Sequence, residues 1–134
     1  PTYDGVISTF YSPDPSDTKW SFVKVTPDLF ISEVAEKIWL GPNATTGING
    51  WKKASDFIHY ANSMIAKNIR TKNEFYVCPV YNEAIQDNKK LRTLDCKKLW
   101  GLGVPEDLDI SITRDMVTIT GNFLKNSVSY PLFG

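Results

Sequence analysis

The chain has 134 residues, of which 42% are hydrophobic and 22% are charged. This length and composition are typical of one folded domain and exclude an intrinsically disordered chain. Fifteen Lys and Arg residues balance fifteen Asp and Glu residues, so the net charge provides no attraction to nucleic acid or to an anionic membrane. We therefore expect neither of these partners.

The cysteines and the start of the sequence indicate the cellular compartment of the protein. The two cysteines, Cys78 and Cys96, are not accompanied by a CxxC pair or by clustered histidines, which excludes zinc-finger and disulfide-rich classes. No apolar run approaches the roughly 18 residues that a membrane span requires, and no basic segment followed by an apolar one opens the sequence. We expect a reduced, cytoplasmic protein.

Strand-forming residues dominate the first third of the chain. β-Branched and aromatic residues predict a strand over 6–10, which ends at a proline-containing loop over 12–17. Two further runs, 20–25 and 29–34, are separated by a turn at 26–28 and predict a β-hairpin.

The central part predicts a strand followed by a helix. Small residues and glycines over 44–51 indicate a strand whose backbone packs closely on a neighbour. Helical spacing predicts a helix of about three turns, with six apolar residues on one face: Ala54, Phe57, Ile58, Ala61, Met64 and Ile65. We expect Ser55 or Asp56 to cap its start, and Lys67 and Asn68 to be favourable at its end.

A second helix, a strand and a helical turn follow. The apolar spacing from Val77 to Ile85 predicts the helix, with Pro79 in its first turn. Residues 91–94 predict a strand, and residues 105–108 predict a helical turn that begins with proline.

This order of elements predicts an α/β fold in which helices pack on a mixed β-sheet. Ligand sites in such sheets lie at the carboxyl ends of strands. We expect residues 1–110 to form the body of the domain. Residues 111–134 contain few charges, and alternation over 116–120 predicts one further strand in this C-terminal extension of the same domain.

Common catalytic motifs are absent from the sequence. It contains no GxxxxGK[ST], GxGxxG, GxSxG or HExxH segment, so P-loop, Rossmann, α/β-hydrolase and zincin classes have no support. Its one histidine, His59, lies off the main apolar stripe of the first helix, and we expect it to be a packing or solvated residue. We expect Cys78 to be a small buried hydrophobic residue, not a nucleophile.

Glu36 and Lys37 are candidate ligand-binding residues at the end of a predicted strand. A carboxylate accepts hydrogen bonds from sugar hydroxyls, and a lysine binds phosphate. Neighbours in an ideal strand face opposite sides, but a bend of the chain toward Gly41-Pro42 would aim both side chains at one pocket. Taken by themselves, the two residues also fit a solvent-facing charge pair.

Six sequence blocks, in one order over about residues 4–109, resemble the C-terminal half of the sugar-phosphate nucleotidyltransferases, which have a GT-A-like α/β fold. The blocks are DGVI (4–7), VAEK (34–37), NATTG (43–47), WKKASDF (51–57), EFYVCPVYNE (74–83) and WGLGVPEDL (100–108). The resemblance implies transfer of a nucleotidyl group from a nucleoside triphosphate to a sugar 1-phosphate, or to another phosphorylated alcohol, with release of pyrophosphate.

The resemblance also implies which residues bind the substrate. Glu36 would hold sugar hydroxyls, Lys37 the acceptor phosphate, and Glu74 would be a pocket carboxylate. The strand from Asn43 to Gly47, with Thr46 in it, would line the sugar pocket, and Gly47 would let the ligand approach the backbone. No residue is assigned a catalytic role.

Two departures from the family pattern limit the predicted activity. The glycine-rich loop that wraps the triphosphate has no counterpart, because the sequence begins after its position. The family uses Mg²⁺, but the position matching its metal-binding Asp is Gly101, so no metal ligand is identified. We therefore expect a nucleotidyltransferase-like fragment that binds the sugar phosphate and is inactive alone.

Two other interpretations remain open. The chain could be a non-catalytic assembly or sugar-phosphate-binding module that retains the fold without activity, with oligomers forming through the C-terminal strand. It could also be a stable α/β domain without a retained site.

Overall fold

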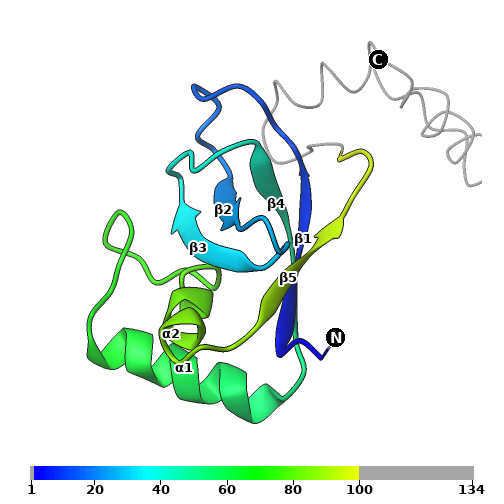
Figure 1. Ribbon diagram of the computed structural model, residues 1–134. Coiled ribbons are helices and arrows are strands. Elements are labelled where there is room, and N and C mark those ends of the chain that lie inside the picture. The colour runs from blue at the N-terminus through cyan, green and yellow to red at the C-terminus, as the bar shows by residue number, and fades with distance from the viewer. Residues whose placement is uncertain (1, 100–134) are drawn as a thin grey trace, which may run out of the picture. The chain divides into compact units, whose positions relative to one another are not determined.

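The computed structural model describes residues 2–99, and the compact unit that they form ends at Lys98 (Figure 1). Its elements are, in chain order, β1 (Gly5–Tyr11), β2 (Ser21–Val25), β3 (Ile31–Glu36), β4 (Asn43–Trp51), α1 (Ala54–Ala66), α2 (Val80–Gln86) and β5 (Leu91–Asp95). The strands and helices predicted within this range are therefore present. The predicted turn over 105–108, the strand over 116–120 and the extension over 111–134 lie outside the described residues.

The strands form one mixed sheet, as predicted. Their order is β3-β2-β4-β1-β5. β2 pairs antiparallel with β3, which confirms the hairpin, and β4 pairs antiparallel with β1, whereas β5 pairs parallel with β1. A parallel pair requires a long connection between its strands, and here the chain between β1 and β5 contains the other three strands and both helices.

A register change interrupts the pairing of β1 with β4. Ile7 is opposite Asn49 and Thr9 is opposite Thr45, so Ser8 alone faces the residues 46–48. Gly47 lies in this bulge with a φ of 86°, a conformation that favours glycine. The regular pairing of β4 with β1 is therefore interrupted at residues 46–48.

The core lies between the sheet and α2, and α1 packs on α2 at the same side of the sheet (Figure 1). Tyr81 of α2 is fully buried, its ring stacks on Trp51 at 4.2 Å, and its hydroxyl reaches the Gly50 carbonyl oxygen at 3.2 Å. A Cβ on Gly5 would lie 2.9 Å from the Gly50 oxygen and 3.3 Å from the Tyr81 ring. Glycine at this position therefore allows α2 to approach the sheet.

The buried face of α1 differs from the predicted stripe. Tyr60 and Met64 are its buried residues, whereas Ile58 and Ile65 are 58% and 50% exposed. The helix turns its aromatic side toward the sheet because Trp51 stacks on Tyr60 at 6.0 Å. The six apolar residues of the predicted stripe are therefore not all buried, and the buried Tyr60 was not part of the stripe.

The predicted helix starts also require correction. The N-cap of α1 is Lys53, which makes no side-chain capping bond, so neither Ser55 nor Asp56 caps the helix. α2 begins at Val80 after an N-cap at Pro79, because proline disfavours the helical conformation at the residue before it. Val77 therefore precedes the helix and is 50% exposed.

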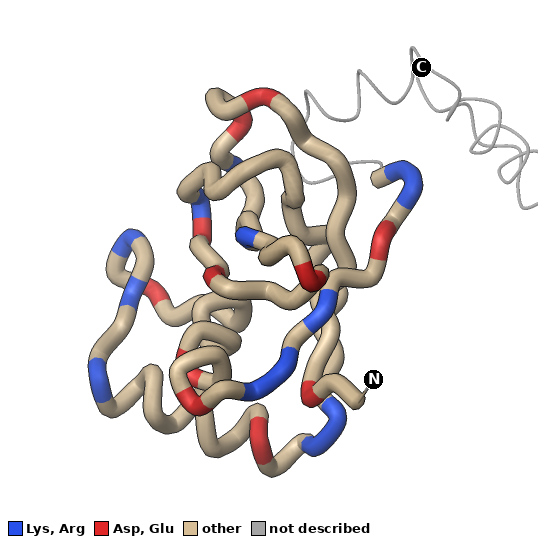
Figure 2. Tube along the Cα trace, viewed as in Figure 1, with Lys and Arg blue, Asp and Glu red and all other residues tan. Residues whose placement is uncertain are grey.

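Charges of both signs are interspersed along the described trace (Figure 2). None of the helices in the described part of the chain is long and apolar enough to span a membrane.

Candidate functional site

A cavity of about 520 Å³ opens where the end of β3 meets β4 and the segment before α2. β2 contributes one lining residue, β3 one and β4 three, and the loop between the helices contributes the others. The lining residues are Ser21, Glu36, Thr45, Gly47, Asn49, Tyr76, Val77 and Cys78. Because they come from separate parts of the sequence, the cavity forms only when the chain folds.

Glu36 forms the polar part of the inner wall. It is the last residue of β3, is only 8% exposed, and pairs across the strands with Ser21. The Ser21 hydroxyl donates a hydrogen bond to Glu36 Oε2. A buried carboxylate held in this way presents fixed acceptor oxygens to hydroxyl or amino donors of a ligand.

Cys78 lies beside this carboxylate as a buried thiol, 5% exposed and not in a disulfide. Burial raises the pKa of the Cys78 thiol, and the Ser21 and Thr45 hydroxyls next to it only partly oppose this effect. The thiol therefore stays protonated and acts as a small wall residue, as predicted.

Lys37 follows Glu36 in the left-handed backbone conformation, with a φ of 58°. Its N–H donates to the Trp20 carbonyl oxygen at 2.9 Å, which anchors the chain at this reversal. The bend expected near Gly41-Pro42 thus occurs at Lys37 itself. This conformation breaks the alternation of β3. Lys37 does not line the cavity itself, but its side chain contacts Tyr76, which does.

The Lys37 side chain ends beside Tyr76, a residue of the cavity lining, and we call this position the rim of the cavity. Its Nζ donates to the Tyr76 hydroxyl at 3.0 Å and lies 5.0 Å from the Tyr76 ring centroid. The Tyr76 hydroxyl donates in turn to Glu74 Oε2 at 2.7 Å. The hydrogen bond with Tyr76 raises the pKa of Lys37, with smaller contributions from the Glu36 and Glu74 carboxylates. The ammonium is therefore charged at neutral pH.

β4 lines the cavity with alternate residues. Thr45 is buried in the wall, and Gly47 leaves open space where a Cβ would stand. Asn49 Oδ1 is buried and has no hydrogen-bond partner among the described residues, while its Nδ2 donates to the Gly47 carbonyl oxygen at 3.3 Å. This oxygen is a second acceptor in the cavity lining.

The structure brings together four of the six residues that the resemblance implied. Glu36 and Gly47 line the cavity, and Lys37 and Glu74 join it through Tyr76. Thr46 does not line it, because alternation along β4 assigns the lining position to Thr45, and the Thr46 hydroxyl instead accepts from the Ile48 N–H at 3.3 Å. Asn43 does not line it either.

Asn43 stands at the start of β4, where it pairs with Tyr11 at the other end of the strand from Trp51. It is therefore on β4 but is not one of the cavity-lining residues. The prediction that the whole segment from Asn43 to Gly47 lines a pocket holds only for Thr45 and Gly47.

Sequence reasoning missed several lining residues, among them Ser21, Asn49 and Tyr76. The period-two alternation of β4 was a signal for Asn49, which lies two residues after Gly47 and so faces the same side of the strand. Tyr76 lies two residues after Glu74, within a block already singled out. Ser21 could be found only from its cross-strand pairing with Glu36.

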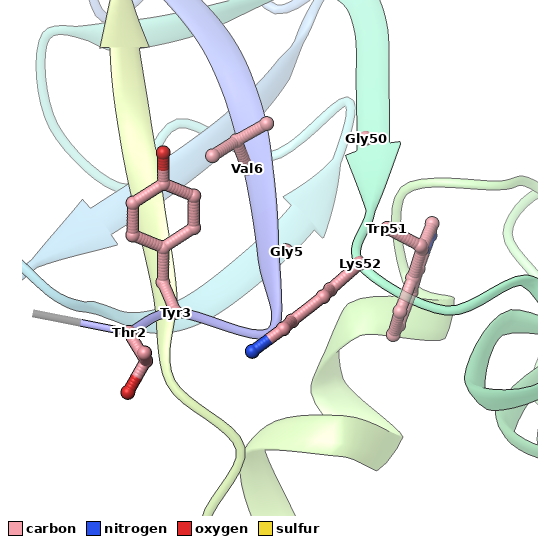
Figure 3. Close-up of a pocket in the computed structure, with 7 residues that line it drawn as sticks. All are labelled: Thr2, Tyr3, Gly5, Val6, Gly50, Trp51 and Lys52. Carbon is pink, nitrogen blue, oxygen red and sulfur yellow. The ribbon is translucent and has the colours of Figure 1, made fainter.

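A second cavity, of about 450 Å³, lies at the paired ends of β1 and β4 (Figure 3). Tyr3, Val6, Trp51 and Lys52 surround it, with Gly5 and Gly50 between them. It has no carboxylate in its lining and none of the residues that the resemblance implied. The first cavity is therefore the candidate site.

The arrangement can bind a ligand with two chemically different ends. Acceptor oxygens of Glu36 and Asn49 lie in the wall, and the Lys37 ammonium lies at the rim. No group of three His, Cys, Asp or Glu side chains that could hold a metal ion occurs within residues 2–99. His59 is exposed, and its ring meets the Tyr60 ring edge-on at 5.0 Å.

Comparison with solved structures identifies the fold. The chain is similar to the nucleoside-diphosphate-sugar pyrophosphorylase from Vibrio cholerae RC9, with a TM-score of 0.72 and 21% identity over 84% of this chain. It is also similar to CMP:2-keto-3-deoxy-manno-octonic acid synthetase in complex with CTP, with a TM-score of 0.52 and 9% identity over 91% of this chain. The described domain therefore has a nucleotidyltransferase-like α/β fold.

The chain spans about half the length of these two proteins, 47% and 51% of their chains. No family model matches the sequence, and a search of curated proteins finds no match.

Proposed function

We propose that this chain is the acceptor-binding part of a nucleotidyltransferase-like protein, and that its cavity binds a sugar 1-phosphate or a similar phosphorylated alcohol. The observation that carries the proposal is the reversal at Lys37. Glu36 and Lys37 are neighbours in sequence, yet one lines the cavity wall and the other reaches the rim through Tyr76.

The chemistry of the two ends matches the two parts of such a ligand. Sugar hydroxyls would donate to Glu36 and Asn49 Oδ1, which would also give that buried oxygen a partner. The ester phosphate would accept from Lys37, whose charge is maintained by its neighbours. The open space at Gly47 would let the sugar ring contact the β4 backbone.

In the proposed reaction, a phosphate oxygen of the acceptor attacks the α-phosphorus of a nucleoside triphosphate. A new P–O bond forms, the bond from the α-phosphorus to the bridging oxygen breaks, and pyrophosphate leaves with the bonding electrons. The residues of this chain would bind the acceptor and orient its phosphate. The Mg²⁺ expected from the resemblance has no ligand cluster among residues 2–99, so no step is assigned to it.

Titration calorimetry of the full chain with glucose 1-phosphate tests the proposal, with glucose and inorganic phosphate as separate titrants. We expect the sugar phosphate to bind more tightly than either titrant. Lys37→Ala should weaken its binding by about tenfold or more, because the change removes a charged hydrogen-bond donor to the phosphate. Lys24→Ala is the matched control, because Lys24 is an exposed lysine outside the cavity lining.

Two results would reject this function. One is the absence of sugar phosphate binding to a folded wild-type chain. The other is equal affinity of wild type and Lys37→Ala, which would separate the ammonium from the ligand.

A further inference from the structure

Tyr76 is held at a defined place on the cavity rim. The segment that carries it starts at a tight turn, where Thr71 and Glu74 exchange two backbone hydrogen bonds of 2.9 and 3.0 Å. It ends at the buried Cys78 and at the N-cap of α2. Between these two anchored ends, Tyr76 forms part of the cavity wall.

The hydrogen bonds of Tyr76 have one consistent direction. A phenol carries a single proton, and an ionised carboxylate can only accept. The proton therefore points to Glu74 Oε2 at 2.7 Å, and a lone pair of the same oxygen faces Lys37 Nζ at 3.0 Å. Glu74 sets the orientation of the hydroxyl, and the hydroxyl sets the position of the ammonium.

This contact restrains a side chain that is otherwise flexible. A lysine side chain has several rotatable bonds, so it loses rotamer entropy when its ammonium is fixed. In this domain part of that loss occurs before a ligand binds, since the ammonium has both a hydrogen bond and a ring contact with Tyr76. Preorganisation of this kind increases affinity without adding a contact to the ligand.

We propose that Tyr76 is a positioning residue for the phosphate end of the cavity, holding the Lys37 ammonium where the ligand's phosphate binds, with Glu74 as its orienting partner. The inference rests on the proposed function, because it assigns the phosphate of the acceptor to Lys37. It places the phosphate at the rim and the hydroxyl-bearing part against Glu36.

The test uses Tyr76→Phe in the full chain, because this change removes the hydroxyl and keeps the ring. We expect the affinity for glucose 1-phosphate to fall by about three- to tenfold, as for loss of one ordinary hydrogen bond. Weak binding of glucose itself should stay unchanged. Glu74→Gln should reduce the affinity less, because the amide oxygen can still accept from Tyr76. Tyr11→Phe, at a 74% exposed tyrosine outside the cavity, is the matched control.

A second readout follows the Lys37 ammonium directly and requires no ligand. Carbon-detected NMR titration of the Lys37 side chain should show a lower pKa in Tyr76→Phe than in wild type or Tyr11→Phe. The charged or titratable groups that act on Lys37 are Tyr76, Glu36 and Glu74, and the two carboxylates remain in the variant. A merely structural role for Tyr76 would leave this titration unchanged.

The outcomes separate the two proposals. If wild type binds glucose 1-phosphate and Tyr76→Phe binds it equally well, Tyr76 does not position the ammonium and this inference is overturned. If wild type does not bind the sugar phosphate at all, the proposed function fails and the inference fails with it. Thermal unfolding midpoints of the variants within about 2 °C of wild type would show that folding does not account for a loss.

Discussion

The side-chain amide of Asn82 makes two hydrogen bonds with the backbone of Val34. Its Nδ2 donates to the Val34 carbonyl oxygen at 2.7 Å, and its Oδ1 accepts from the Val34 N–H at 2.8 Å. The Asn82 side chain, which belongs to α2, thus makes the pair of backbone hydrogen bonds that a neighbouring strand would otherwise make with β3. Val34 is two residues before Glu36, so this pair of bonds also fixes the strand end that carries the candidate site.

Asn82→Ala should lower the free energy of unfolding by about 2 kcal/mol, because it leaves the Val34 N–H and the Val34 carbonyl oxygen without their hydrogen-bond partner. Urea denaturation followed by circular dichroism measures the change. Asn62→Ala, at an exposed position on α1, should change the stability by less than about 0.5 kcal/mol. A similar small effect at both positions would show that water replaces the amide at Val34 without cost.

Lys37→Gly and Lys37→Ala should both lose sugar phosphate affinity but differ in stability. The φ of 58° at Lys37 is unfavourable for any residue with a Cβ. We expect the glycine variant to be more stable than the alanine variant by about 1 kcal/mol, again measured by urea denaturation. If alanine is as stable as glycine, the backbone at this position is not left-handed in solution.

Acid should remove a stabilising contribution of Glu83. Hydrogen bonds from Lys67 at 2.7 Å and from Ser63 at 2.6 Å lower the pKa of Glu83 below its ordinary value of 4.5. A carboxylate with a lower pKa in the folded state stabilises the fold above its unfolded pKa, and the contribution disappears as the pH falls through the folded pKa. The loss should therefore begin near pH 4.5 and continue below it.

The free energy of unfolding of wild type and Glu83→Gln, measured from pH 6 to pH 3, tests this sign. The difference between them should shrink as the pH falls, because a protonated Glu83 and the glutamine that replaces it are both uncharged. Glu33→Gln, at an exposed glutamate of β3, should show a difference that depends little on pH. A difference at Glu83 that grows in acid would contradict the lowered pKa.

Cys78 should react slowly with iodoacetamide at neutral pH, and glucose 1-phosphate should slow it further. Burial both restricts access and raises the pKa of its thiol, and the thiolate is the reactive form. Cys96, which is less buried, is the internal control and should not respond to the ligand. Mass spectrometry of the two peptides gives both rates. Equal protection of both cysteines would indicate a general effect on stability instead of occupancy of the cavity.

The positions of the strands could be predicted from local residue patterns. β-Branched runs, a proline-containing turn and apolar alternation placed β1, β2, β3, β4 and β5 within a few residues of their bounds. These signals are local, since they reflect which residues suit an extended backbone. The bulge at Gly47 is different, because it depends on the register between β1 and β4.

The candidate site was predictable only in part. Glu36 and Lys37 were candidates from their place at a predicted strand end, whereas Gly47 and Glu74 came from a resemblance between sequence blocks. In the structure Glu36 and Gly47 line the cavity, and Lys37 and Glu74 are linked to it through Tyr76. Tyr76 was not predicted, although it joins Lys37 to Glu74. Its role depends on a hydrogen bond across 39 positions of sequence, and no periodicity within one element can indicate such a contact.

The amino-acid sequence by itself determined that this chain forms an α/β domain and that a carboxylate and an ammonium follow each other at the end of β3. Local backbone preferences and apolar spacing suffice for that much. Only the tertiary structure decided that α1 buries Tyr60 in place of its isoleucines, and that Lys37 turns back to the cavity that Glu36 lines. Both outcomes depend on a distant partner, Trp51 in one case and Tyr76 in the other.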